Sequence, residues 1–198
     1  MRLATDINQK LFEVATNRTR LEEVIADSEK RLAYLRKLAD DESSTLNTTR
    51  LGRRLQRHGR YLALADDHRA AIEAKDEAIE IWERHDRRRA HFLCRLQRAS
   101  IRCRAGEPDR ARSAVEQLAE EIDETTGVYI DIVDETLARC WHALGDGHRA
   151  LEYLEAALAV RIERGNRNHI DQTRRMMATV CRCHPELDDE FVSPDSTA

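Results

Sequence analysis

Signals that end one helix and begin the next recur along this chain at a nearly constant interval. They centre on Asp66, Gly106 and Gly145, which are separated by 40 and then 39 residues (66 to 106, 106 to 145). One further interval towards the N-terminus reaches Ala26 and Asp27, where a weaker signal of the same kind lies. A fixed period of this length, with two helices in each unit, is typical of a helical solenoid.

The clearest unit begins at residues 145–160, with the sequence GDGHRALEYLEAALAV. Gly145 and Asp146 end one helix and open another, which carries small and apolar residues at helical spacing. Around Gly106, the sequence AGEP gives a left-handed helix end followed by proline in a first helical turn. Only seven Gly and three Pro occur in 198 residues, so few residues are suited to the tight turns of β-hairpins. The chain is therefore predicted to be all-α.

The apolar spacing and the turn signals together divide the chain into three parts. Residues 46–183 are predicted to form the helical repeats, and residues 184–198 a disordered acidic tail with two prolines. The predicted helices cover residues 48–64, 66–84, 87–104, 108–124, 128–144, 145–165 and 168–183.

Residues 1–45 allow two interpretations, because their apolar residues follow three- and four-residue steps with few turn signals. The preferred one is a helical hairpin that bends near Ala26–Ser28, where Asp27 or Ser28 caps the second helix. The other is a single long helix that associates with a second copy through its apolar seam. The seam residues are Ile7, Leu11, Val14, Leu21, Ile25, Leu32, Leu35 and Ala39.

The unit around Gly145 resembles the tetratricopeptide repeat family. In that family a Leu–Gly/Ala–x–x–aromatic cluster precedes the turn glycine, and an alanine follows five residues after it. The matching residues are Leu137, Ala138, Trp141, Gly145, Ala150, Leu154 and Ala157, with partial matches at Ala99, Gly106 and Ala111 and at Gly59, Ala71 and Ala78. The period is longer than the usual one, at about 40 residues.

This resemblance implies a right-handed superhelical solenoid of antiparallel helix pairs, with about three and a half repeats and a capping helix. Small residues at the helix crossings would let the paired helices approach closely. An unrelated helical bundle is the alternative.

Arginine is concentrated on two of the predicted helices. On the helix at 48–64, the arginines lie opposite the leucine stripe, and a second row lies on the helix at 87–104. The resemblance implies that the first helix of each pair lines a concave groove. The candidate groove residues are Arg53, Arg57, Arg60, His91, Arg95, Arg98 and Arg102.

Since arginine offers paired donors to carboxylates, a partner protein with an acidic segment is the predicted ligand. A solvated surface paired with acidic neighbouring helices is the alternative interpretation. Nucleic acid fits less well, because no aromatic residues alternate with the arginines and the net charge is −4.

Other classes of function find little support in the sequence. It contains no Gly-rich phosphate loop, HExxH motif or nucleophile elbow, so we expect no enzyme and no cofactor. Cys181, Cys183 and His184 lack the second half of a zinc site, so no metal is expected. No stretch is long and apolar enough for a membrane span, and five scattered cysteines indicate a reducing, cytoplasmic location.

The predicted function is that of a non-catalytic adaptor or scaffold for protein–protein interaction. The alternative is an assembly module that forms a homodimer through residues 1–40.

Overall fold

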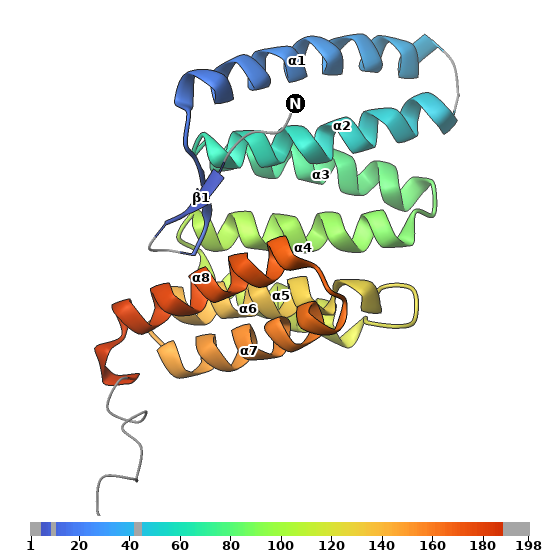
Figure 1. The fold of residues 1–198 in the computed structure, drawn as a ribbon. Coiled ribbons are helices and arrows are strands. Elements are labelled where there is room, and N and C mark those ends of the chain that lie inside the picture. The colour runs from blue at the N-terminus through green and yellow to red at the C-terminus, as the bar shows by residue number, and fades with distance from the viewer. Residues whose placement is uncertain (1–4, 9–10, 42–44, 188–198) are drawn as a thin grey trace, which may run out of the picture.

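The computed structural model describes residues 5–8, 11–41 and 45–187 of the chain. In this part of the chain, a short β-hairpin is followed by eight α-helices that run back and forth (Figure 1). The helices are α1 (Arg18–Asp41), α2 (Thr45–Leu64), α3 (His68–Arg84), α4 (Arg88–Arg104), α5 (Pro108–Glu120), α6 (Ile130–Ala143), α7 (Gly147–Glu163) and α8 (Arg167–Cys183). Two single 3₁₀ turns, η1 (Gly127–Tyr129) and η2 (Pro185–Leu187), complete the described elements. The prediction of a helical chain is confirmed, and the seven helices after residue 45 lie where the sequence placed them.

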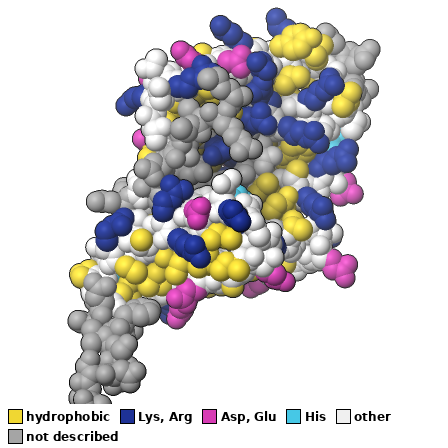
Figure 2. Space-filling view, viewed as in Figure 1, with side chains coloured by type: hydrophobic (Ala, Val, Ile, Leu, Met, Phe, Trp, Pro, Cys, Tyr) yellow, Lys and Arg dark blue, Asp and Glu magenta, His cyan; other side chains and the backbone are white. Residues whose placement is uncertain are grey.

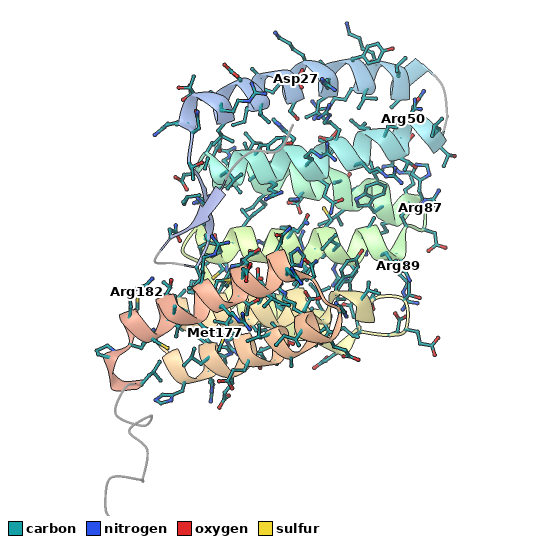
Figure 3. All side chains as sticks on the ribbon, in the orientation of Figure 1. Asp27, Arg50, Arg87, Arg89, Met177 and Arg182 are labelled. Atoms are coloured by element: carbon teal, nitrogen blue, oxygen red, sulfur yellow. The ribbon has the colours of Figure 1, made fainter. Side chains whose placement is uncertain are left out.

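The predicted helical hairpin within residues 1–45 is wrong. Helix α1 continues without a break through Asp27, near its middle (Figures 1 and 3). The carboxylate of Asp27 does not cap a second helix, because it pairs with Arg31 one turn later, at 2.9 Å. The apolar positions of α1 also stay on one face, where Leu21 and Leu32 are buried. A continuous helix therefore buries the apolar residues that were expected to be buried between the two helices of a hairpin.

The residues before α1 form two antiparallel strands, which their apolar spacing did not predict. Strand β1 (Thr5–Ile7) pairs with β2 (Glu13–Ala15), with Asp6 opposite Val14. The side chain of Asn8 closes the turn by accepting a hydrogen bond of 3.0 Å from the backbone N–H of Phe12. Leu11 adopts a positive φ of 62°, an uncommon conformation for a residue other than glycine. A long helix through residues 1–40 is therefore also excluded.

Five of the connections between helices share one backbone geometry. Each contains a residue with positive φ, and the following N–H donates to the carbonyl five residues before it. The positive-φ residues are Asp66, Asp86, Gly106, Gly145 and Gly165. Asp66 thus takes the conformation that glycine takes in the other two predicted turns. The connection from α5 to α6 is longer and contains η1.

The core consists of apolar clusters that follow one another along the stack. One joins α1 to α4, the next joins α4, α5 and α6, and the last joins α6, α7 and α8. Each helix packs mainly against the helix that follows it in sequence. Among the residues described, no helix is long and apolar enough to cross a membrane.

The residues assigned to repeat packing lie mostly inside this core. Ten of the thirteen are buried: Gly59, Ala71, Ala78, Ala99, Ala111, Leu137, Ala138, Ala150, Leu154 and Ala157. Gly106 and Gly145 occupy turns, and Trp141 is half-buried between the guanidinium groups of Arg112 and Arg149.

The segment after α8 begins with ordered structure rather than with a disordered tail. His184 is buried beside Gly147, and the side chain of Leu187 joins the cluster of α6, α7 and α8. The prediction of disorder is therefore wrong for residues 184–187. Residues 188–198, with most of the acidic side chains, lie outside the described residues.

The crossing of α2 and α3 gives a test of the close packing. A Cβ atom at Gly59 would lie 3.0 Å from the carbonyl oxygen of Ala71 and 3.1 Å from Cε of Lys75. We expect Gly59→Ala to lower the free energy of unfolding by about 1–2 kcal/mol, although alanine is the better helix former. Gly127→Ala is the matched control, because the nearest atom to its Cβ is 4.0 Å away. Urea denaturation of both variants measures the difference; equal stabilities would contradict close packing at Gly59.

Candidate functional site

A cavity of about 350 Å³ opens between α2, α4, α6 and α8. Its apolar wall includes Leu96 and Ile132, but most of its charged groups are cationic. Lysine and arginine side chains are also prominent on the face of the molecule shown in Figure 2, over the upper helices and around α8. The positively charged lining residues are Arg60, Lys75, Arg104, Arg139 and Arg161, with His169 beside them, and Glu135 is the single acidic lining residue within the described part of the chain.

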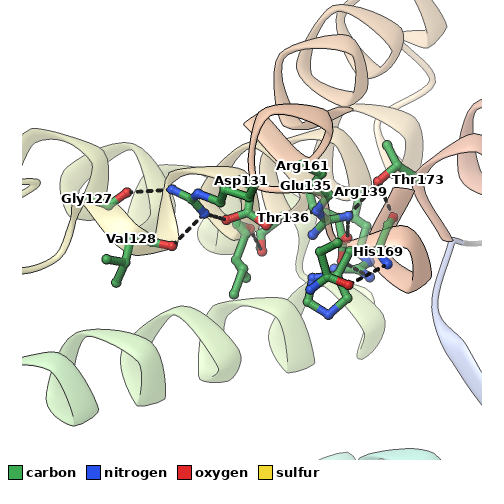
Figure 4. A network of polar contacts seen from close by, with 12 residues as sticks. Gly127, Val128, Asp131, Glu135, Thr136, Arg139, Arg161, His169 and Thr173 are labelled. Carbon is green, nitrogen blue, oxygen red and sulfur yellow. Dashed lines mark hydrogen bonds and ion pairs between the residues drawn. The ribbon is translucent and has the colours of Figure 1, made fainter. Parts of the chain in front are cut away.

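The acidic lining residue belongs to a buried network of ion pairs that joins α6 to α7 (Figure 4). Glu135 contacts Arg139 through one carboxylate oxygen and Arg161 through the other, each at 2.5 Å. Arg161 also pairs with Asp131 at 2.9 Å, and Arg164 completes the row by contacting Asp131 at 2.7 Å. Three arginines thus share two carboxylates, so that the negative charge of Glu135 is already neutralised within the protein.

This network is held away from water and also positions α8. The side chains of Glu135, Arg139 and Arg161 are each more than nine-tenths buried, and Arg161 donates to the hydroxyl of Thr173 on α8 at 2.6 Å. Burial opposes ionisation of Glu135, but Arg139 and Arg161 outweigh it and keep the pKa of Glu135 below its ordinary value. Burial and the negative charge of Asp131 raise the pKa of the neighbouring Asp134 to about 6.

The β-hairpin closes one side of the cavity. The carbonyl oxygen of Leu11 accepts a hydrogen bond of 2.9 Å from Nε of Arg139. The ring of Phe12 lies near two guanidinium groups, 5.7 Å from that of Arg104 and 5.6 Å from that of Arg139. Contacts at these distances are attractive cation–π interactions. The hairpin therefore orients two of the cationic residues that line the cavity.

Lys75 of α3 is the most deeply buried cation of the cavity, with 1% of its surface exposed. Its ammonium group donates to the carbonyl oxygen of Gln56 at 2.5 Å and to Oε1 of Gln97 at 2.7 Å. Burial lowers the pKa of Lys75 to about 8. In the part of the chain that the structure describes, Lys75 forms no ion pair with a carboxylate.

The predicted groove residues do not form one site. Arg60 lines the cavity, whereas Arg53 and Arg57 are exposed elsewhere on α2. Arg98 faces α3, where it pairs with Asp76 at 2.5 Å. Arg102 is half-buried on α4 and does not line the cavity.

His91 and Arg95 line a smaller, separate pocket of about 240 Å³. Arg95 pairs with Glu121 there at 2.5 Å, and Arg95 lowers the pKa of that carboxyl through the hydrogen bond. Burial, followed by the positive charge of Arg95, lowers the pKa of His91. The arginine row of α4 is therefore largely paired with the acidic residues of neighbouring helices, as the alternative interpretation of the stripes described.

Four cationic residues of the cavity were missed, although the sequence contains a signal for two of them, Lys75 and Arg139. Asp131, Glu135 and Arg139 recur at four-residue steps along α6, which places opposite charges on one helix face. Lys75 lies four residues after Ala71 and three before Ala78, within a stripe of buried alanines. Charged residues on an otherwise buried stripe indicated an internal polar site. Arg104 and Arg161 lie near the ends of their helices, and only the packing brings them to the cavity.

The histidine near the C-terminus, His184, contacts another histidine rather than a group of metal ligands in the described part of the chain. His184 faces His142, with Nε2 and Nδ1 3.1 Å apart. Within residues 5–8, 11–41 and 45–187, no three His, Cys, Asp or Glu side chains are grouped so that they could hold a metal ion.

The buried network predicts that replacing one carboxylate by an uncharged amide lowers the free energy of unfolding strongly. Glu135→Gln leaves two buried guanidinium groups without their shared counter-charge, so the free energy of unfolding should fall by about 3 kcal/mol or more. Because the pKa of Glu135 is lowered by folding, this carboxylate stabilises the protein above its ordinary pKa and less as the pH falls through the folded value. The difference between the two proteins should therefore shrink as the pH falls below the ordinary pKa of glutamate. Urea titrations at neutral and acid pH measure this difference in the free energy of unfolding. The control is Glu120→Gln on exposed surface, which should have little effect at either pH.

Asp134 should show the opposite pH dependence. Its raised pKa means that the protonated form is favoured in the folded state, so its contribution to stability is lost as the pH rises through about 6. Because the loss begins at the ordinary aspartate pKa, Asp134→Asn should raise the melting temperature more near pH 8 than near pH 5. Asp171→Asn on the exposed side of α8 is the control. A gain that is the same at both pH values would contradict the burial of this carboxyl.

Comparison with known proteins supplies no assignment for this site. Neither a protein-family model nor a curated protein matches the sequence. The helical stack and its cationic cavity are therefore the observations that bear on function.

Proposed function

We propose that this protein is a non-catalytic adaptor that captures an acidic segment of a partner protein in the cavity between α2, α4, α6 and α8. The observation that carries this proposal is the charge of the lining: five lysine or arginine side chains face one glutamate, which is already paired with two of them. A ligand that brings carboxylates would balance this excess. The five cysteines are free, which suits the reducing cytoplasm that we propose as its location.

The fold supports this proposal if the helices are grouped as repeat units. Helices α2 and α3, α4 and α5, and α6 and α7 are then three tetratricopeptide-like pairs, α8 is the capping helix, and α1 is the second helix of an incomplete first unit. Three and a half units arranged in this way would form the right-handed superhelix. The first helices of the pairs, α2, α4 and α6, each contribute residues to the cavity, and in this arrangement they would line the concave face.

The energetics require several contacts at once. One exposed ion pair contributes about 0.2–1 kcal/mol, whereas a micromolar complex needs about 8 kcal/mol. The cavity offers its cations together with apolar surface from residues such as Leu96, Ile101 and Ile132. A segment in which acidic residues alternate with apolar ones would use both kinds of surface.

The assembly alternative receives less support from the same contacts. The apolar seam of α1, on which a homodimer through residues 1–40 would depend, packs against α2 in the same chain through Leu32, Ile25 and Leu35. This seam is not free to join a second copy.

Charge reversal at the cavity tests the proposal. Arg60→Glu combined with Arg104→Glu replaces two lining cations by anions, so the affinity for a fluorescent oligoglutamate peptide should fall at least about tenfold. The matched control is Arg53→Glu combined with Arg57→Glu, which changes the net charge equally on exposed surface of α2. Fluorescence anisotropy gives the affinities, and circular dichroism checks that both variants are folded.

Binding by the native protein should also weaken as salt rises, because part of the attraction is electrostatic. If the two double variants lose peptide affinity equally, only the net charge of the protein matters. The assignment of the cavity as the peptide-binding site would then be wrong. Absence of peptide binding by the native protein would overturn the proposed function itself.

A further inference from the structure

Lys75 differs from the other buried cations around the cavity in what surrounds its charge. Arg139 and Arg161 share the carboxylate of Glu135, and Arg104 pairs with Asp66 at 2.8 Å. Among the described residues, the ammonium group of Lys75 has two neutral oxygen acceptors, from Gln56 and Gln97. An ammonium group has three N–H donors, so one donor remains for a further acceptor.

A purely structural role does not account for a lysine at this position. Removing an ammonium group from water without a counter-charge costs several kcal/mol, and an apolar side chain of similar volume avoids that penalty. The stem of Lys75 also occupies space that a side chain at position 59 would fill, since a Cβ atom on Gly59 would lie 3.1 Å from Cε of Lys75. The fold thus accommodates the lysine at the expense of packing on α2.

Lys75 and its acceptor Gln97 are both among the residues that line the cavity, whereas Gln56 is not. The neighbouring titratable groups are Arg60 from α2 and the thiol of Cys94 from α4, whose pKa burial raises to about 11. Neither of these groups carries negative charge near neutral pH, so the missing counter-charge has to come through the cavity.

We propose that Lys75 anchors one side-chain carboxylate of the captured acidic segment, which enters beside Gln97 and accepts the remaining N–H of the ammonium group. This inference rests on the proposed function and identifies the residue that selects a carboxylate at the inner end of the cavity. The surrounding arginines attract the acidic segment. Lys75 fixes the register of this segment, because the one remaining N–H donor of its ammonium group can bind only one carboxylate.

Binding of a carboxylate to Lys75 should increase the number of protons that the protein holds. The pKa of Lys75 is about 8 in the free protein, and an adjacent carboxylate favours the charged ammonium form and raises it. Near pH 8.5 the free protein is partly deprotonated at Lys75, so binding takes up protons from the buffer. The affinity therefore falls as the pH rises above about 8, in a range where histidine is already neutral.

Calorimetric titration with the oligoglutamate peptide, in two buffers of different ionisation enthalpy near pH 8.5, measures this uptake in the native protein. Lys75→Met should bind at least about tenfold more weakly and without the Lys75 proton uptake. Its free energy of unfolding should equal or exceed that of the native protein, which separates a loss of binding from a loss of folding. Lys37→Met on the exposed face of α1 is the control and should bind like the native protein.

The outcomes separate the two proposals. If the native protein binds the peptide without proton uptake, or if Lys75→Met binds as tightly as the native protein, the role of Lys75 is overturned and the adaptor function stands. If the native protein does not bind the peptide at all, the adaptor function fails and the anchor fails with it. Weaker binding by Lys75→Met, together with loss of uptake and unchanged stability, supports the anchor.

Discussion

Each helix of this protein buries its apolar stripe mainly against the helix that follows it, and the rest of the structure depends on this constraint. The contacts are short in sequence, so the core is a row of small clusters rather than one central mass. Small residues at the crossings, such as Gly59 and Ala71, allow the helix axes to approach. A stack of this kind leaves one edge of several helices facing a common space, and the cavity lies there.

The cavity is cationic in a chain whose net charge is −4. Acidic residues pair with many arginines of the surface and of the buried network, and the described lining residues of the cavity include five lysines or arginines and one glutamate. Arg161 illustrates the arrangement, since it contacts Asp131, Glu135 and Thr173 and so joins three helices while it faces the cavity. The same side chains thus stabilise the stack and set its electrostatic character, which couples the shape of the cavity to the integrity of the network.

The hairpin shows how a short segment completes a repetitive fold. Leu11 and Phe12 come from the N-terminal end of the described chain but pack on α4, α6 and α8, far away in sequence. The hydrogen bond from Arg139 to Leu11 joins residues that are 128 positions apart. Without this segment, Arg104 and Arg139 would lack the aromatic ring that lies near both of them. The hairpin therefore links the two ends of the stack at the cavity wall.

The helices after residue 45 and their turns could be predicted from the amino-acid sequence, because helix periodicity and left-handed turn residues are local properties. Asp66, Gly106 and Gly145 were recognised from their immediate neighbours, and these neighbours also fix the backbone there. Arg60 was a candidate groove residue because of the arginine stripe, and it lines the cavity.

Which charged side chains meet depends on how the helices pack against one another. Arg95 and Arg98 had the right spacing for a groove, but acidic residues of adjacent helices lie within reach and neutralise them. Lys75, Arg104, Arg139 and Arg161 come from four different helices, so no local pattern could group them. The β-hairpin was missed for a related reason: its apolar spacing also fits a helix, and only burial of Leu11 and Phe12 between distant helices favours the extended form.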